Sequence, residues 1–491
     1  MFCLTHIQQI SATMLQRLSL VLLFLMCHLS MPAQTDDEIV VDYDFLSSLA
    51  LPVLDIHTID GEMPTCEFIT EDGGNRKSIT NQTEVPGRFV MTLKGDTLYD
   101  SDEYKVNKRG ITIKIRGNTS AYYQNPSYKI KLQQKADLLM RDNPIYKDKN
   151  WVLLRTGARP HTLIGLFVNQ QLHMQWTPCY QLVNVMLNDD YRGLYYLIEN
   201  VRRSVGRLNI SERGFILEYD AYYWNADYYI PSLYPDYMNW TFKYPDATDF
   251  VEEEELYIKQ QLYEMERAMM RGGYKDYVDL VSFAKWQLGQ DILGQGDSWG
   301  SNIYLTKFDN TSDSKFMMAN MWDFDWIMNI PYDTFPKSHT NRFVFLSGRM
   351  FHSSPDLLAE YVHQWHLLMD EGFAEHIQQF IDSLDLSPLK ADINASIQLT
   401  NQRWPYNFPL IDSYLQPARD WFNQRLEWMN DTIRVLEQQL VETSLPALVA
   451  DDSTPANVVY YDLSGQRRHT PLRGVNVVVM PNGTRRKLLQ R

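Results

Sequence analysis

Two aspartates, Asp323 and Asp325, stand two positions apart in the otherwise apolar and aromatic run Met-Trp-Asp-Phe-Asp-Trp-Ile-Met at 321–328. Carboxylates are seldom buried unless they are paired or bind a metal, because removing a charge from water costs several kcal/mol. Their oxygens suit Mg²⁺ or Mn²⁺, and a strand would point both side chains to the same side. A turn cap and a salt bridge would also explain them, but the apolar surroundings favour a metal site.

Asp297 and Asn302 lie upstream in a glycine-rich loop that interrupts a helical pattern. Their D-x-x-x-x-N spacing is that of a protein-kinase catalytic loop, in which the Asp orients the attacking hydroxyl and the Asn helps to hold a metal. Asp and Asn in such loops more often just form turns. The spacing therefore gains weight only beside the Asp323–Asp325 pair.

A triphosphate site also needs a cation. Lys129 and Lys131 alternate on one face of an expected strand, close in sequence to Arg116. We take Lys131 as the candidate that neutralises phosphates, with Arg116 near it and Glu199 as the carboxylate that would hold the lysine. An ordinary solvent-facing role fits a strand lysine equally well.

The usual signatures of nucleotide, zinc-protease and hydrolase sites are absent from the sequence. There is no G-x-x-x-x-G-K-S/T loop, no G-x-G-x-x-G after a strand, no H-E-x-x-H and no G-x-S-x-G. The acidic residues therefore carry the chemical hypothesis.

The elements that must position these residues change in type along the chain. Alternating apolar residues predict strands at 51–56, 88–93, 111–116, 128–132, 181–187 and 193–198, the last two joined as a hairpin. Helical spacing follows at 252–269, at 277–293 and over most of 355–440, with interruptions near Pro405 and Pro409. The split predicts an α+β architecture with a β-rich N-terminal half, a helical C-terminal half and a cleft between two lobes.

Length and charge limit the classes of protein. A chain of 491 residues is too long for one simple core, which favours two or three domains. A formal net charge of −15 without a basic stripe argues against a general nucleic-acid binder.

The first 33 residues resemble a secretory signal, with Arg17 before the apolar run 18–29 and cleavage expected after Ala33. The surroundings of Cys27 do not favour a lipoprotein anchor. No later segment is apolar enough to span a bilayer, so we expect export to the periplasm, the cell surface or the medium. Cys66 and Cys179 would then form one disulfide or remain two free thiols.

The remaining chain divides into three parts by pattern. We expect an N-terminal β-rich region at 34–110, a main domain at 111–445, and a linker with a short β module at 446–491.

Several motifs together resemble one family, the CotH (spore-coat protein H) kinases, in the order in which that family carries them. They are Ile115-Arg116-Gly117-Asn118-Thr119-Ser120, Pro126-Ser127-Tyr128-Lys129-Ile130-Lys131-Leu132, Lys149-Asn150-Trp151-Val152-Leu153-Leu154, residues 187–199, Arg207-Leu208-Asn209-Ile210, Gly214-Phe215-Ile216-Leu217-Glu218 and Trp322-Asp323-Phe324-Asp325. The tail 458–491 resembles C-terminal modules of exported proteins from Bacteroidetes-type bacteria.

The resemblance implies an atypical, two-lobed protein-kinase-like fold that uses ATP and a divalent cation, Mg²⁺ or Mn²⁺, to phosphorylate Ser or Thr of protein partners. It gives Asp297 the catalytic-loop role and Asp323 the metal role, with Asn302 and Asp325 in support. The chain departs from the family where many members carry an Asp and then an Arg-Asn pair, because it has Pro160, Gly165 and Leu166 there.

Two other functions remain open. A catalytically inactive surface-binding module would keep the fold without turnover, and the departure at 160–166 favours it. A glycosyltransferase-like enzyme would use Asp323-Phe324-Asp325 as a D-x-D metal site.

Overall fold

The computed structural model describes residues 41–490 except 73, 75, 156–158, 235–237, 247–248, 298–301, 337–353, 445–446, 449–457, 462–465, 471–473 and 481–484. The expected signal segment 1–33 and residues 449–457 of the expected linker lie outside the described residues. Residues 42–491 form one compact unit.

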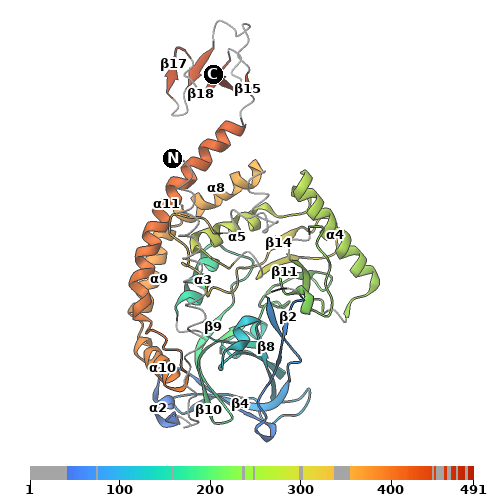
Figure 1. Cartoon of the computed structure of the whole chain (residues 1–491), viewed down its shortest axis with the longest axis vertical. Coiled ribbons are helices and arrows are strands. Elements are labelled where there is room, and N and C mark those ends of the chain that lie inside the picture. Colours follow the sequence, from blue (N-terminus) through green and yellow to red (C-terminus); the bar gives the residue numbers. More distant parts are fainter. Residues whose placement is uncertain are drawn as a thin grey trace, which may run out of the picture. The chain divides into compact units, whose positions relative to one another are not determined.

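Seven strands of the N-terminal half close into a barrel, in the order β1-β9-β10-β8-β7-β6-β4, because β1 pairs with both β9 and β4 (Figure 1). The strands of this half are β1 Val53–Thr58, β2 Glu67–Thr70, β3 Lys77–Thr80, β4 Val85–Leu93, β5 Asp96–Asp100, β6 Ile111–Arg116, β7 Ser127–Ala136, β8 Asp148–Arg155, β9 Tyr180–Leu187 and β10 Asp190–Glu199. The six predicted strands and the hairpin that joins the last two are confirmed, with the turn at 188–189, whereas β2, β3, β5 and β8 were not anticipated.

Alternate residues of the barrel strands fill its interior, as the two-residue period of a strand requires. This core includes Phe89, Tyr128, Trp151 and Tyr195, each at most 1% exposed. The expected region 34–110 contributes β1 and β4 to this barrel, so residue 110 does not separate two folding units.

A second sheet and a set of helices follow the barrel. The sheet has the order β12-β11-β13-β14 and contains β11 Phe215–Asp220, β12 Asn239–Tyr244, β13 Ile303–Lys307 and β14 Phe316–Met318. The helices are α2 Tyr43–Ser48, α3 His161–Gln171, α4 Glu252–Arg271, α5 Leu280–Leu293, α8 Pro355–Asp370, α9 Phe373–Asp385, α10 Lys390–Arg403 and α11 Asp412–Ser444. The α10–α11 connection contains Pro405 and Pro409, as predicted.

The outer face of β8 and β10 packs into a second apolar core. Val152 and Ile198 join α3, α5, α8 and the four-stranded sheet there. The fold is therefore a mixed α+β arrangement with a β-rich N-terminal half and a helical later half. Among the described residues, no helix combines the length and apolar character of a membrane span.

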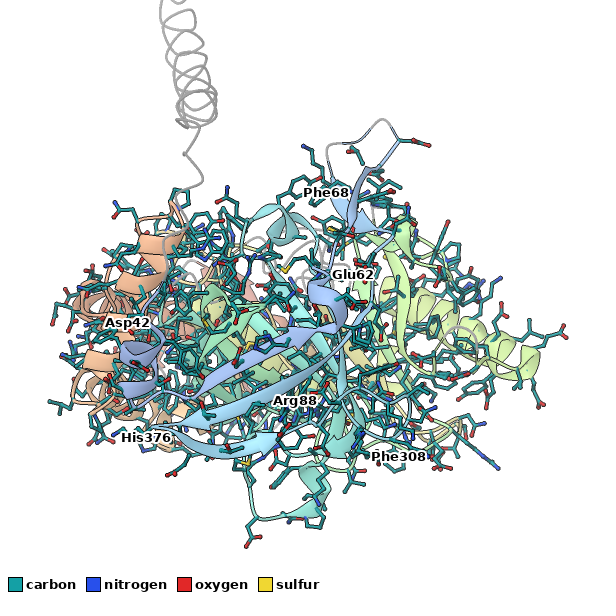
Figure 2. All side chains as sticks on the ribbon, turned by 90° about the horizontal axis from the view of Figure 1, so that it is seen from below. Asp42, Glu62, Phe68, Arg88, Phe308 and His376 are labelled. Atoms are coloured by element: carbon teal, nitrogen blue, oxygen red, sulfur yellow. The ribbon has the colours of Figure 1, made fainter. Side chains whose placement is uncertain are left out.

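The hairpin β2–β3 stands out from the barrel, with Phe68 on it, while Arg88 marks the barrel strand β4 (Figure 2). Phe68 stacks on Tyr122 with ring centroids 3.8 Å apart, and Ser78 donates a hydrogen bond to Asn118 over 2.6 Å. The hairpin thus holds the loop that follows β6.

A small C-terminal sheet has the order β15-β19-β18-β16-β17, formed by β15 Ala447–Leu448, β16 Val459–Tyr461, β17 Arg467–Arg468, β18 Gly474–Val479 and β19 Arg485–Gln490. The expected β module is present, and the basic residues from Arg485 belong to its strand β19. Cys66 and Cys179 are both free thiols.

Candidate active site

The acidic residues singled out in the sequence line one cavity of about 450 Å³ between the end of the barrel and the four-stranded sheet. Asp297, Asn302, Asp323 and Asp325 all contribute to it, together with Arg116 from β6. Two regions about 200 residues apart in the chain therefore meet here.

The Asp323–Asp325 segment is a turn, so the expected strand geometry is wrong. Asp323 has a left-handed backbone with φ of 60°, and residues 325–328 form a turn. The backbone N–H of Asp325 donates to the Asp323 carboxylate. Both carboxylates still line the cavity, because the turn, in place of a strand, directs the two side chains toward it.

The C-terminal end of α5 fixes this turn. The helix stops at Gly294, which is left-handed with φ of 55° and acts as its C-terminal cap. Directly after it, the Gln295 side chain donates to the carbonyl of Asp323 over 2.7 Å, and the N–H of Gly296 donates to the carbonyl of Trp326 over 3.0 Å. The glycine-rich loop thus positions both Asp297 and the Asp323 turn.

Phe324 anchors the turn on the other side, against α3. A Cβ at Gly165 would come within 2.1 Å of the Phe324 ring, so the ring lies directly on the helix backbone. Phe324 is 3% exposed. Gly165, one of the positions at which the chain departs from its family, therefore makes room for Phe324, the residue between Asp323 and Asp325.

Asn302 lies beside Asp323, with its Nδ2 3.4 Å from Asp323 Oδ2, and has a left-handed backbone with φ of 64°. Asp297 lies on the exposed rim of the same cavity. Residues 298–301, between them, are outside the described part of the chain. Both residues of the D-x-x-x-x-N pair thus line the same cavity as Asp323.

The cavity is completed by four charged residues that were not candidates from the sequence, namely Arg155, Glu218, Asp220 and Lys243. Lys243 on β12 forms an ion pair with Glu218 on β11, Nζ to Oε2 2.6 Å, and Arg155 at the end of β8 faces Asp325. Glu218 belongs to a quoted family motif, whereas Lys243 and Arg155 carried no signal in the sequence. Only strand pairing brings β11 and β12 together.

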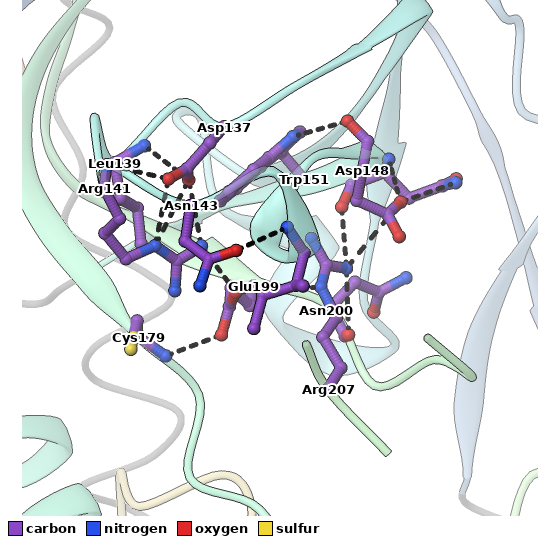
Figure 3. Close-up of polar contacts among 12 residues, drawn as sticks. Asp137, Leu139, Arg141, Asn143, Asp148, Trp151, Cys179, Glu199, Asn200 and Arg207 are labelled. Carbon is purple, nitrogen blue, oxygen red and sulfur yellow. Dashed lines mark hydrogen bonds and ion pairs between the residues drawn. The ribbon is translucent and has the colours of Figure 1, made fainter. Parts of the chain in front are cut away.

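Lys131 and Glu199 are not among the described residues that line this cavity. Lys131 is exposed on β7, and Glu199 is buried elsewhere, where its carboxylate accepts from Arg141 over 2.8 Å and from the N–H of Cys179 over 2.9 Å (Figure 3). The expected pairing of Glu199 with Lys131 is therefore wrong, because two other donors already hold that carboxylate.

The network around Glu199 is structural. Arg207, 4% exposed, donates to the carbonyl of Asn150 over 2.9 Å and lies 3.9 Å from Glu199 (Figure 3).

Glu199→Gln should lower the unfolding free energy by about 3 kcal/mol, because it leaves two guanidinium groups without their shared buried charge. Urea denaturation measures this. Glu212→Gln, at an exposed carboxylate 3.6 Å from Arg203, should change little; equal effects would contradict the argument.

The pKa values of three carboxyl groups in the cavity, Asp220, Asp323 and Asp325, are raised. Burial, and then the charge of Asp323, raise the pKa of Asp325 to about 7. Burial and the charge of Glu218 raise that of Asp220 to about 6, and burial also raises that of Asp323. Among the described lining residues, the carboxylates of Glu218, Asp220, Asp297, Asp323 and Asp325 outnumber the cations Arg116, Arg155 and Lys243 by five to three.

This excess of negative charge suits a divalent cation. Among the described residues, no group of three or more His, Cys, Asp or Glu side chains is already arranged as a metal site. Asp323 and the Asn302 amide nevertheless fit Mg²⁺ or Mn²⁺, because such ions commonly take one or two protein carboxylates and complete their shell with water and phosphate oxygens.

The comparisons with known proteins place these residues in a family context. A family model described as "CotH kinase protein" matches residues 113–431, which include the whole candidate site. No curated protein matches the chain.

Proposed function

This chain belongs to the CotH kinase family, and on that premise we propose that it is an exported atypical kinase that transfers the γ-phosphate of ATP to Ser or Thr of protein partners. The observation that carries the proposal is the cavity in which Asp297, Asn302 and Asp323 meet beside Arg116 and Lys243. The two-lobed kinase-like arrangement, with the cavity between the lobes, is part of the same proposal.

The proposed roles follow from position. Asp323 and Asn302 would hold Mg²⁺ or Mn²⁺, with Asp325 in support, and the bound ion would neutralise the charge of the triphosphate. Arg116 and Lys243 lie where they can contact phosphate oxygens, and Glu218 orients Lys243 through their ion pair. Asp297, on the exposed rim, would accept the proton of an incoming hydroxyl.

The departure at 160–166 does not leave the cavity without an arginine. Arg155 lines it, and the charges of Arg155 and Arg159 both lower the pKa of Asp325. This favours turnover over the inactive binding module that the departure first suggested.

The test is to incubate the mature chain with Mn²⁺, γ-labelled ATP and a panel of acceptor proteins, and to follow label on the acceptors and on the chain itself. We expect metal-dependent transfer and nucleotide-dependent thermal stabilisation. Absence of both would overturn the proposal in favour of a binding module, and metal-dependent hydrolysis of a sugar nucleotide would favour the D-x-D glycosyltransferase.

Metal binding should strengthen as pH rises through about 7. Protons occupy Asp325 below its pKa of about 7 and compete with a cation. Without metal, a raised carboxyl pKa makes the native state bind more protons than the unfolded state, so this contribution to stability is lost as pH rises through about 7. Denaturation at about pH 5.5 and 7.5, with and without Mn²⁺, measures both effects. Asp325→Asn should flatten the metal-free trend; an unchanged trend would contradict it.

A further inference from the structure

A second groove, of about 660 Å³, lies at the other end of β7 and β8. Five basic residues line it, namely Lys135, Lys147, Lys149, Arg202 and Arg203. This is a concentration of positive charge on a chain whose formal net charge is −15. The sequence shows no basic stripe here, because these residues are scattered between positions 135 and 203.

The acidic neighbours do not neutralise this groove. Asp148, its one described acidic lining residue, is 5% exposed and accepts from the N–H of Asn150 over 2.8 Å. Arg207 lies 4.0 Å from it on the buried side (Figure 3). Of the groove cations, Arg203 lies 3.6 Å from the exposed Glu212.

Further cations lie along the barrel between the groove and the active-site cavity, with one exposed carboxylate among them, Glu84, 4.0 Å from Lys114. Lys114 and Lys129 are direct neighbours on β6 and β7, Lys131 follows two residues on, and Arg116, two residues from Lys114, lines the cavity. Burial lowers the pKa of Lys129 to about 8, with help from the charges of Lys114 and Arg202. Lys131, which the ATP site does not use, belongs to this surface.

We propose that this basic surface, from the groove to Arg116, docks an acidic segment of the protein that the kinase phosphorylates. That the docked protein is the substrate of phosphorylation rests on the proposed function, whereas the binding of an acidic segment does not. β8 has Asp148 at the groove and Arg155 at the cavity, so the two sites are about 23 Å apart at roughly 3.3 Å per residue. An extended acceptor would carry its acidic segment about seven residues from the phosphorylated hydroxyl.

The lining of the groove fits a peptide better than other polyanions. Ile145 and Val205, 42% and 66% exposed, flank the cations and offer contact to apolar side chains. Among its described lining residues there is no aromatic ring on which a base could stack.

The experiment measures binding of a fluorescein-labelled oligoglutamate to the full mature chain, without ATP, against an oligoglutamine of equal length. We expect oligoglutamate to bind and its affinity to fall with salt. Lys147→Glu with Lys149→Glu should weaken it about tenfold or more. Arg267→Glu with Arg434→Glu makes the same change of charge at exposed positions on α4 and α11 and should leave it unchanged.

Equal binding by the two double variants would overturn the docking site. Tighter binding of single-stranded DNA, or of phosphatidylserine vesicles, with the same sensitivity to Lys147 and Lys149, would overturn its assignment to a peptide. Asp323→Asn should still bind oligoglutamate, so a failure of docking and a failure of phosphoryl transfer remain distinguishable.

Discussion

Asp323→Asn should reduce phosphoryl transfer by about a hundredfold or more, while the folded structure is kept. The substitution preserves the shape of the side chain and removes the charge that we assign to the metal. Asp323 is the carboxylate on which Asn302 and Arg116 converge, so no neighbour replaces it at the same point. Transfer of label from ATP measures the rate, and the thermal shift produced by Mn²⁺ measures the site directly.

Two further substitutions calibrate this result. Asp325→Asn should reduce transfer by less, because Asp325 supports the site from the side of Arg155. Asp313→Asn, at an exposed carboxylate outside the lining of the cavity, should leave transfer unchanged. If Asp323→Asn retained both transfer and the Mn²⁺ shift, Asp323 would not be the metal ligand.

Local sequence patterns revealed the elements but not how they close. The alternation in 51–56 and 88–93 predicts strands, yet only their pairing with 181–187 and 111–116 makes a barrel. The closing pair of β1 with β9 joins segments more than a hundred residues apart, such as Val53 and Asn184, and period-two patterning carries no information about partners at that range.

Sequence patterns likewise revealed some residues of the site and missed others. Asp323 and Asp325 were visible because charges in an apolar run demand an explanation, and Asp297 and Asn302 because glycines broke a helix around them. Lys243 and Arg155 were not, because a single cation in a strand is ordinary until the fold brings it to a carboxylate. Lys131 had the right residue type, but its strand presents it to the exposed surface.

Gly165→Ala should disable the site without touching any charged residue in it. The new methyl would overlap the Phe324 ring, which has an atom only 2.1 Å from the Cβ position. Either α3 or the 323–328 turn must then move, and overpacking of this kind costs typically about 1–3 kcal/mol. Because Phe324 lies between Asp323 and Asp325, a shift of the ring displaces both carboxylates. We expect a loss of phosphoryl transfer of about a hundredfold, since small displacements of catalytic groups have effects of that size.

A second substitution separates positioning from general damage to the fold. Phe324→Leu in the Gly165→Ala background removes the overlapping ring atoms and should recover much of the Mn²⁺ shift and of the transfer. Phe324→Leu alone should weaken both, because it leaves a space against Gly165. A double-mutant cycle with these variants therefore should show strong favourable coupling between the two positions. Additive losses would mean that Gly165 serves the packing of α3 and has no part in holding the two aspartates.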